Sequence, residues 1–368
     1  MTDKKAMKFI TEYLEQYEPY KDHWNYEDGC TLIGCTDLFR VTGEQKYADF
    51  VQRYADERLD ENGEIRNYVA EEHAIDNILS GRVLFFLYDR TGDEKYRKAA
   101  AFLKDQLMEQ PRCKCGSFWH KDRYPNQVWL DGLYMAQPFY MEYETRWNGK
   151  ECCSDVAAQF ETVHKKLFNQ EKGLYYHAWD EAGLQPWADK KTGLSPNFWL
   201  RSEGWLLMAL IDTMDVMSIE LYEQYDRLRE IFTEAVKGIL PYRDRATNLF
   251  YQITDGAGIK GNYLETSGSA MVAYAVLKGV RLGVLSAEKY EKIGRGILNG
   301  IIDTKLKEED GILHLTGICK VAGLGPGQER DGSTAYYLSE PITQDDPKGV
   351  GPFMMAFAEL MEEDHGKE

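Results

Sequence analysis

Residues 29–43, GCTLIGCTDLFRVTG, and residues 75–92, IDNILSGRVLFFLYDRTG, decide the fold of this chain. In both stretches small or polar residues come first, apolar residues follow at steps of three and four, and Thr-Gly comes last. Such spacing predicts an α-helix. Each Thr-Gly precedes a second amphipathic stretch, residues 44–59 or 93–108. The sequence therefore predicts a helical hairpin that is repeated along the chain.

Four further stretches have the same pattern as the first helix of this hairpin, with small or polar residues first and apolar residues at steps of three and four after them. The six small-residue helices are predicted at residues 29–39, 75–87, 130–139, 201–210, 264–277 and 350–360. More highly charged helices, such as residues 221–238, lie between them. Six pairs around one axis predict an all-α (α/α)6 barrel with the small-residue helices inside, built by residues 1–368 as a single domain. The alternative is an open solenoid of helical pairs, because the helix pattern does not specify closure.

The charge of the chain limits its partners. There are 61 acidic and 44 basic residues, and the net charge of −17 argues against a nucleic-acid partner, whose phosphates need many cations. No apolar run of about 18 residues is present, so we expect no membrane span. Residues 1–17 predict an amphipathic helix rather than a signal peptide.

The seven cysteines do not suit a disulfide framework, because their number is odd and Cys152 and Cys153 are adjacent. Cys113-Lys-Cys115 does not have the spacing of a zinc site. We therefore expect reduced thiols in a cytoplasmic protein without a metal or other cofactor. We expect a monomer or small homo-oligomer.

Tryptophan is concentrated in one part of the chain. Seven of the eight tryptophans lie between Trp119 and Trp205, and only Trp24 lies outside this window. Several adjoin polar residues at predicted helix entries, as in Trp119-His120, Trp129-Leu130-Asp131 and Trp199-Leu200-Arg201. An indole face can pack against the C–H surface of a sugar ring while polar neighbours bind its hydroxyls. We interpret the seven as bordering a carbohydrate groove, with packing beneath long loops as the alternative.

Asp76 and Asp131 open two successive inner helices at equivalent positions. In a closed barrel both carboxylates would point into one cavity. Two neighbouring carboxylates do not both ionise easily, so one of them can act as an acid near neutral pH. The alternative for Asp131 is a purely structural N-cap.

Three further side chains in the tryptophan window are candidates for binding a ligand. His120 and His177 can hydrogen-bond sugar hydroxyls, although a loop histidine is more often a surface or packing residue. Arg201 is the candidate cation for an anionic ligand, because guanidinium binds a carboxylate through two parallel hydrogen bonds. The alternative for Arg201 is an ion pair with Glu203.

Several motifs resemble glycoside hydrolase family 105, the unsaturated rhamnogalacturonyl hydrolases, and more distantly family 88, the unsaturated glucuronyl hydrolases. The matching stretches, in the order of the family, are residues 75–77, 128–135, 176–180, 195–205 and 262–267. The most specific are Trp-x-Asp-Gly-x-Tyr-Met from Trp129 and Ser-Pro-x-Phe-Trp-x-Arg from Ser195. Glu203 is a departure, because the family usually has a small or apolar residue there.

The resemblance implies an (α/α)6 barrel that removes Δ4,5-unsaturated galacturonic acid from the non-reducing end of rhamnogalacturonan oligosaccharides by hydrating its C4=C5 bond. By the same resemblance, Asp131 would be the general acid and base, and Asp76 would orient the sugar and raise the pKa of Asp131. The residues implied to line the sugar site are His120, Trp129, Met135, His177, Trp199, Arg201 and Trp205.

Three other functions stay open at this point. The first is an unsaturated glucuronyl hydrolase that acts on other lyase products. The second is an epimerase or an inverting glycosidase on the same barrel; an inverting glycosidase needs two carboxylates several ångströms apart. The third is a binding scaffold that uses the concave face of a helical repeat.

Overall fold

Six α-helices form an inner ring in the structure, a computed structural model that describes residues 2–365. They are α2 (Tyr26–Thr42), α4 (Arg82–Thr91), α6 (Leu130–Trp147), α8 (Leu200–Asp215), α10 (Thr266–Arg281) and α13 (Pro347–His365). Each corresponds to one of the six stretches predicted from the sequence. In one of these stretches the first residues form a 3-10 helix, Ile75–Gly81, which leads directly into α4.

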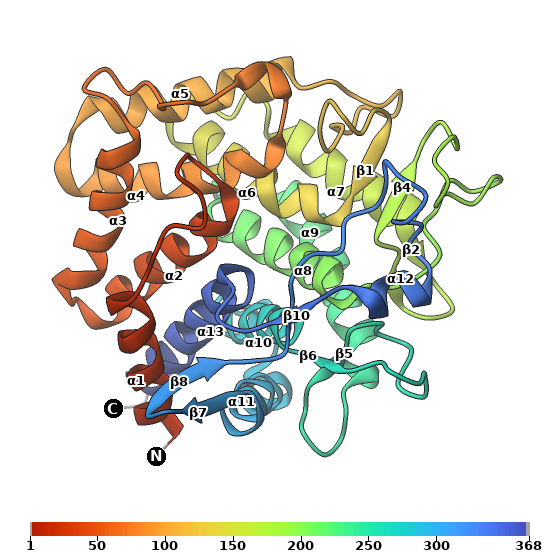
Figure 1. The fold of residues 1–368 in the computed structure, drawn as a ribbon. Helices are drawn as coiled ribbons and strands as arrows, with labels where there is room; N and C mark the ends of the chain where they lie inside the picture. The colour runs from red at the N-terminus through yellow and green to blue at the C-terminus, as the bar shows by residue number, and fades with distance from the viewer. Residues whose placement is uncertain (1, 366–368) are drawn as a thin grey trace.

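The inner ring is closed. Its helices pack in the order α2, α4 with its 3-10 helix, α6, α8, α10 and α13, and α13 then packs against α2. Figure 1 shows this last contact, with α13 in blue beside α2 in red. In an open solenoid the first and last inner helices would not meet. The predicted (α/α)6 barrel is therefore confirmed, and the open alternative is wrong.

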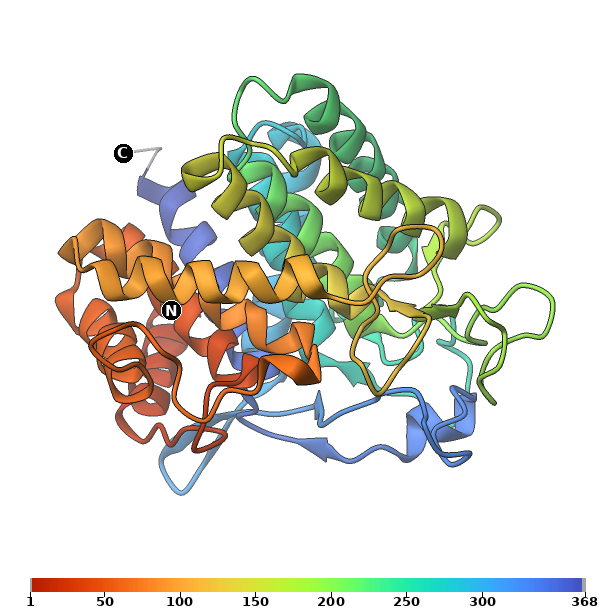
Figure 2. The ribbon, with the colours of Figure 1, turned by 90° about the horizontal axis from the view of Figure 1, so that it is seen from above.

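A second set of helices covers the ring. The outer helices are α1 (Thr2–Glu15), α3 (Gln45–Arg58), α5 (Glu94–Glu109), α7 (Cys153–Leu167), α9 (Tyr222–Ile239) and α11 (Ala287–Thr304). Helix α9 is typical: Leu228, Ile231, Phe232, Ala235, Val236 and Ile239 are buried at helical spacing, and the other face is charged. The inner helix α10 instead buries all of residues 266–279. Figure 2 shows α5 running along the outside of the molecule.

The repeated Thr-Gly ends α2 and α4 in the same way. Gly43 and Gly92 both have a φ of 67°, the left-handed conformation that favours glycine after a helix. Thr42 Oγ1 donates a hydrogen bond to the carbonyl four residues earlier at 2.7 Å and accepts one from the amide two residues later at 3.1 Å. Thr91 Oγ1 makes the same two bonds, at 2.8 and 3.1 Å. The internal repeat is thus visible in the helix caps.

Short strands, which the sequence analysis did not predict, gather with the long connections at one end of the ring (Figure 2). The antiparallel pairs are β1 (Gln127–Trp129) with β4 (Ala178–Asp180), β2 (Phe168–Asn169) with β3 (Leu174–Tyr175), β5 (Phe250–Tyr251) with β6 (Leu264–Glu265), β7 (Leu306–Glu309) with β8 (Ile312–Leu315), and β9 (Ile318–Cys319) with β10 (Ile342–Thr343). The remaining elements are α12 (Thr334–Ser339) and the 3-10 turns Ala70–Glu72 and Leu240–Tyr242. Residues 264–265, predicted as helix, are strand. Strands of two to four residues are too short to show an alternating pattern.

Buried ion pairs fill the ring at the end away from the strands. Asp212, in the last turn of α8, lies 2.9 Å from the guanidinium of Arg82 and 2.8 Å from the ammonium of Lys278. Tyr274 also donates a hydrogen bond of 2.6 Å to Asp212. Each of these buried charges has a partner of opposite charge within the protein. This end of the ring, the closed end, therefore needs no ligand to neutralise it.

Three predicted absences can be compared with the described residues. None of the helices within residues 2–365 is both long and apolar enough to cross a membrane. In the same part of the chain, no three His, Cys, Asp or Glu side chains are placed to hold a metal ion. All seven cysteines are free thiols.

Candidate active site

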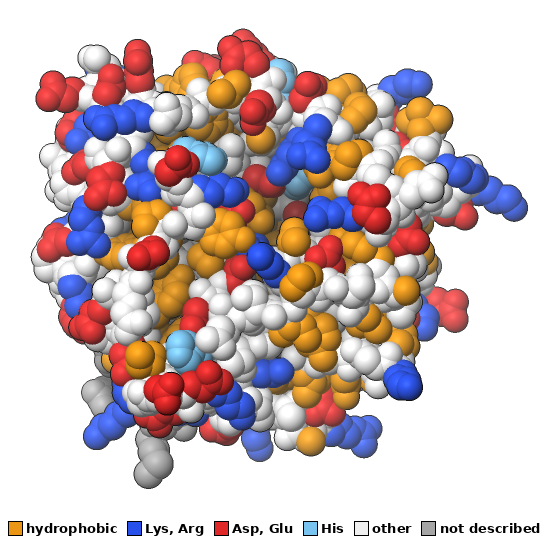
Figure 3. Space-filling view, in the orientation of Figure 1, with side chains coloured by type: hydrophobic (Ala, Val, Ile, Leu, Met, Phe, Trp, Pro, Cys, Tyr) orange, Lys and Arg blue, Asp and Glu red, His pale blue; other side chains and the backbone are white. Residues whose placement is uncertain are grey.

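A cavity of about 380 Å³ lies where the inner helices begin. Its lining includes residues from the first turns of these elements: Tyr26 of α2, Asp76 of the 3-10 helix, Asp131 of α6, Arg201 of α8 and Lys348 of α13. The N-terminal ends of these helices therefore surround one space. Their partial positive charge favours an anionic ligand, even in a chain of net charge −17. Figure 3 shows the hollow near the centre of this face, with charged side chains around it.

Asp131 lies at the edge of this cavity with an oxygen available. It is the second residue of α6, and the residue at the N-cap position is Trp129, so Asp131 does not have the structural role that was its alternative. Its Oδ2 lies 3.2 Å from His177 Nε2. Among residues 2–365, no group makes a well-aligned hydrogen bond to this oxygen. Oδ2 is itself buried against His177, so the exposed remainder of the carboxyl group, in a side chain that is 15% exposed, is what a ligand in the cavity can reach.

His177 is buried directly behind Asp131. Its Nδ1 lies 2.7 Å from the hydroxyl of Tyr337. Burial raises the pKa of Tyr337 well above its usual value, so the hydroxyl stays protonated and can donate to Nδ1. With Nδ1 as the acceptor, the N–H of the ring is on Nε2, which faces Asp131. His177 was predicted to contact the ligand, but its side chain is fully buried and is not part of the cavity lining.

The pairing of β1 with β4 brings these groups together. Trp129 is opposite Ala178, and the amide of Leu130 donates to the carbonyl of His177 at 3.1 Å. The Trp129 ring packs edge to face on the His177 ring, with 5.4 Å between centroids. Trp199 packs on the same imidazole at 4.7 Å. The two tryptophans therefore hold the imidazole in place.

Asp76 lies in the same cavity but is strongly paired. His120 Nε2 is 3.2 Å from one of its oxygens, and the ammonium of Lys121 binds the other. Burial raises the pKa of Asp76, but the ammonium of Lys121, together with His120 in its protonated form at low pH, outweighs this effect and holds the pKa below its usual value. Burial lowers the pKa of His120 to about 4, so its ring is neutral at pH 7. His120 also stacks on Trp129, with 4.5 Å between ring centroids.

Arg201 lines the cavity from a nearly fully buried position. Its guanidinium donates to the carbonyls of Cys319 and Lys320 and to Ser267 Oγ, and it lies 4.9 Å from the Trp199 ring. No ion pair joins Arg201 to Glu203 in the described part of the chain, so the structural alternative for Arg201 is not observed. Glu203 is buried elsewhere, and burial raises its pKa well above the usual value.

The tryptophans divide into two groups. Trp129, Trp199 and Trp205 line the cavity, as does Met135. Trp147 instead packs against Phe85 beneath the outer helices, with 4.9 Å between ring centroids. The lining of the cavity also excludes Trp119, Trp179 and Trp187. The interpretation that all seven tryptophans border one groove was wrong, because most of them fill space between helices and loops.

The structure adds residues that the sequence analysis missed. Tyr26 is at the entry of the first inner helix, the position equivalent to Asp76 and Asp131, and this equivalence could have found it. Lys121 follows His120 directly. Lys348 begins the last inner helix. Tyr337 lies in the short helix α12 and gives no recognisable signal in the sequence.

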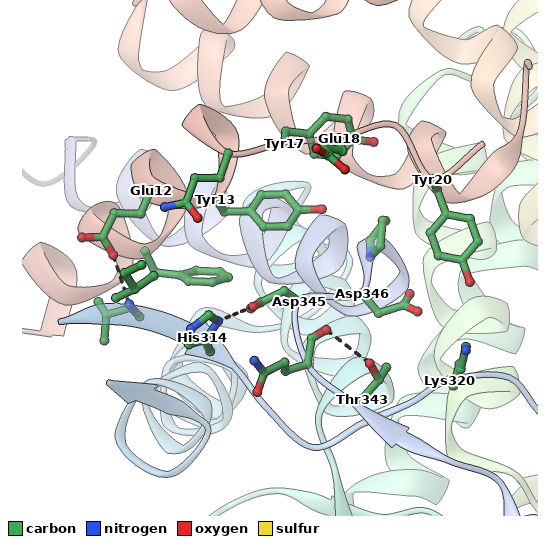
Figure 4. Close-up of a pocket in the computed structure, with 16 residues that line it drawn as sticks. Glu12, Tyr13, Tyr17, Glu18, Tyr20, His314, Lys320, Thr343, Asp345 and Asp346 are labelled. Atoms are coloured by element: carbon green, nitrogen blue, oxygen red, sulfur yellow. Dashed lines mark hydrogen bonds and ion pairs between the residues drawn. The ribbon is translucent and has the colours of Figure 1, made fainter. Parts of the chain in front are cut away.

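Figure 4 shows a second cavity, of about 370 Å³. Its side chains come from α1, β8 and the connection from β10 into α13, and many of them are paired with one another, as His314 is with Asp345 at 2.5 Å. Lys348 lines the first cavity, but its ammonium binds Asp346 at 2.8 Å and the hydroxyl of Tyr20 at 3.4 Å, both in the second. The two cavities therefore share a wall.

Comparisons with known proteins agree with this site and fold. Residues 1–363 match the model of Glycosyl Hydrolase Family 88. A family 105 glycoside hydrolase from C. acetobutylicum has a solved structure with a TM-score of 0.92 and 42% identity, over 98% of this chain and 99% of that chain. Unsaturated rhamnogalacturonyl hydrolase YesR of Bacillus subtilis is 24% identical over 294 residues, which are 78% of this chain and 77% of that protein.

A more distant structure shares the fold alone. An unsaturated glucuronyl hydrolase specific for heparin has a TM-score of 0.73 and 16% identity, over 99% of this chain and 97% of that chain. The resemblance inferred from the motifs is therefore confirmed over nearly the whole length of the chain. The protein belongs to glycosyl hydrolase family 88 and is a glycosidase, with a family 105 enzyme among its similar structures.

Proposed function

We propose that this glycosidase removes Δ4,5-unsaturated galacturonic acid from the non-reducing end of rhamnogalacturonan oligosaccharides, with Asp131 as general acid and base. The observation that carries the proposal is the Asp131 carboxylate, which lines the cavity beside the buried pair of His177 and Tyr337. A group that transfers protons needs an accessible oxygen in a fixed orientation. The name of the Bacillus subtilis relative gives the same substrate class for that protein.

The reaction uses one carboxyl group twice. The double bond of the substrate is an enol ether, so protonated Asp131 gives its proton to C4, and positive charge develops on C5 and the ring oxygen. The Asp131 carboxylate then takes a proton from the water molecule that attacks C5. The hemiketal opens to a ketone, and the hemiacetal left at C1 releases the neighbouring sugar. Asp131 ends the cycle protonated, as it began.

Asp76 has a different task in this scheme. Its low pKa keeps it ionised, so it can accept a hydrogen bond from a sugar hydroxyl and stabilise the positive charge near C5. Lys121 and His120 hold its two oxygens in place. The expectation that Asp76 raises the pKa of Asp131 stays a prediction.

We assign the carboxylate of the unsaturated ring to Arg201. Guanidinium has five N–H donors, and Arg201 has three hydrogen bonds with the protein, so donors are left for a ligand in the cavity. His120, Trp129, Met135, Trp199 and Trp205 would surround the sugar, and His177 would position Asp131. We propose that residues 1–368 work as one domain, as a monomer or small homo-oligomer in the cytoplasm, without a nucleic-acid or membrane partner.

A spectroscopic assay tests the proposal. The unsaturated galacturonyl-rhamnose disaccharide absorbs ultraviolet light through its C=C bond, and the wild type should abolish this absorbance. An unsaturated glucuronyl disaccharide with a neighbouring sugar other than rhamnose tests the closest alternative function. The neighbouring sugar has to differ, because C4 is not a stereocentre in the unsaturated ring and the ring is therefore the same compound in both substrates. Asp131→Asn should retain the fold and lose the activity. Near wild-type turnover by this variant would refute the role of Asp131, and loss of absorbance only with the glucuronyl substrate would reassign the enzyme.

A further inference from the structure

Two arginines at the mouth of the catalytic cavity have no acidic partner. Arg123 and Arg330 line this cavity from two different loops. The neighbouring cations are neutralised, since Lys21 pairs with Glu27 at 2.9 Å and Lys348 with Asp346 at 2.8 Å. In the part of the chain that the structure describes, residues 2–365, no carboxylate lies within ion-pair distance of Arg123 or Arg330. With 61 acidic residues in the chain, two unpaired arginines in this cavity in addition to Arg201 require an explanation.

The two arginines stand at the ends of a row of aromatic rings. The guanidinium of Arg123 lies 5.0 Å from the Tyr124 ring, and that ring lies 4.8 Å from Trp129. Gly323 lies between Trp129 and the other arginine: a Cβ placed there would be 3.2 Å from Arg330 Nη1 and 3.7 Å from Trp129 Cη2. The row is therefore Arg123, Tyr124, Trp129 and Arg330. Both rings are buried, so they fix the positions of the two arginines, and the guanidinium groups are left to bind the carboxylate of an acidic sugar.

We infer that Arg123 and Arg330 form a second anionic subsite, which binds the carboxylate of the uronic acid two rings beyond the cleaved bond. This inference rests on the proposed function and extends it to longer substrates. Rhamnogalacturonan alternates galacturonic acid with rhamnose, so negative charge recurs on every second ring. The first carboxylate goes to the inner cavity with the cleaved ring. The neutral rhamnose follows, and the second carboxylate reaches the arginines at the mouth.

The subsite would offset the electrostatic repulsion between this acidic protein and an acidic oligosaccharide. A net charge of −17 repels an oligosaccharide that carries several carboxylates. The two unpaired arginines oppose this repulsion where the second carboxylate arrives, and a guanidinium group can bind a carboxylate through two parallel N–H donors. The enzyme should therefore prefer a tetrasaccharide to a disaccharide.

Steady-state kinetics with two substrates test the subsite. The substrates are the unsaturated galacturonyl-rhamnose disaccharide and the tetrasaccharide that has one more galacturonyl-rhamnose unit. For Arg123→Ala/Arg330→Ala, we expect the KM for the tetrasaccharide to rise about tenfold with kcat unchanged, the loss of about one charge-assisted contact. The KM for the disaccharide should not change. High salt should reduce the preference of the wild type for the tetrasaccharide, because the arginines lie at the solvent-exposed mouth.

Control variants separate this effect from a general loss of charge. Arg245→Ala removes an exposed arginine between α9 and β5 and should leave both KM values unchanged. Arg123→Lys/Arg330→Lys keeps the charge and should restore part of the preference for the tetrasaccharide. If the double alanine variant changes both substrates equally, or neither, the subsite is refuted while the proposed function stands. If the wild type cleaves neither substrate, the proposed function fails and the subsite with it.

Discussion

Two aspartates on neighbouring inner helices differ in burial and in the number of charged partners that their carboxylates have. Asp212, near the end of α8, is fully buried and lies within 2.9 Å of Arg82 and 2.8 Å of Lys278. Asp131, at the start of α6, has one contact of 3.2 Å, to His177, and is partly exposed. At the closed end the polar groups satisfy one another, whereas at the open end an acidic oxygen is left for a ligand. Stability and chemistry are thus located at opposite ends of the same ring.

The direction of the helices explains this division. The C-terminal ends of helices carry partial negative charge, which suits the cations Lys278 and Arg281 in the last turn of α10. The N-terminal ends carry partial positive charge and suit anions from the protein or the substrate. Because α2, α6, α8, α13 and the 3-10 helix before α4 begin around the cavity, these small effects add up at one place.

The largest effect in this comparison is expected from Asp131→Asn. The substitution removes the proton donor and should lower kcat by about 10³-fold, within the range for general acid–base catalysis. The free energy of unfolding should stay within about 0.5 kcal/mol of the wild type, because no strong partner is lost. Urea unfolding and the absorbance assay measure the two quantities. A strongly destabilised variant would show that the open end also carries stability.

Asp212→Asn should have the reverse profile. It leaves Arg82 buried without its carboxylate partner, whereas Lys278 keeps Asp215 at 2.8 Å, so the expected cost is about 3 kcal/mol of unfolding free energy, the lower end for breaking a buried pair. Turnover per folded molecule at low temperature should stay close to that of the wild type. Thermal and urea unfolding test the first expectation. A cost below about 1 kcal/mol would mean that water reaches the closed end and solvates these charges.

A smaller effect is expected from Tyr337→Phe. The change removes the hydroxyl that orients His177, so kcat should fall about tenfold with little change in KM, as for the partner of an orienting imidazole. Because Tyr337 acts through Asp131, the same substitution in an Asp131→Asn background should cause no further loss. Additive losses in this double-mutant cycle would show that Tyr337 has an independent role.

The effect of Glu203→Gln should be smallest near pH 5 and grow as the pH rises. Glu203 is buried and its pKa is raised well above 4.5, so above pH 4.5 the folded chain retains a proton that the unfolded chain releases. The wild type should therefore lose stability as the pH rises, by at most about 1.4 kcal/mol per pH unit from this group. Glutamine does not titrate, so the variant should become more stable than the wild type as pH rises from about 5 to 8. Parallel melting curves of the two proteins over this range would contradict the assignment.

Local features of the chain were predictable from the sequence. The inner helices follow from apolar spacing, and their ends follow from Thr-Gly, because both depend on residues close together in the chain. Asp76, Asp131 and Arg201 were identified from their positions at helix entries and from the motifs around them. The structure places all three in the lining of one cavity.

Features that depend on distant pairs were not predictable. Tyr337 and His177 are 160 residues apart in the sequence, and Arg201 and the carbonyl of Cys319 that accepts its hydrogen bond are 118 apart. A residue type alone does not reveal such partners, which only the closed ring brings together. The prediction that the seven tryptophans border one groove was wrong for the same reason. An indole that packs under a loop and one that faces a cavity have similar neighbours in the chain.

The contact between α2 and α13 also determines when the core can be completed during synthesis. Arg40 and Glu359 form a hydrogen bond of 3.1 Å although 319 residues separate them, and Gly351 lies so close that a Cβ there would be 2.4 Å from the carbonyl of Cys30. A ribosome makes α2 long before α13. Until α13 emerges, one apolar side of α2 has no partner and is exposed to water. That side of α2 is the surface that a chaperone would have to cover on the nascent chain.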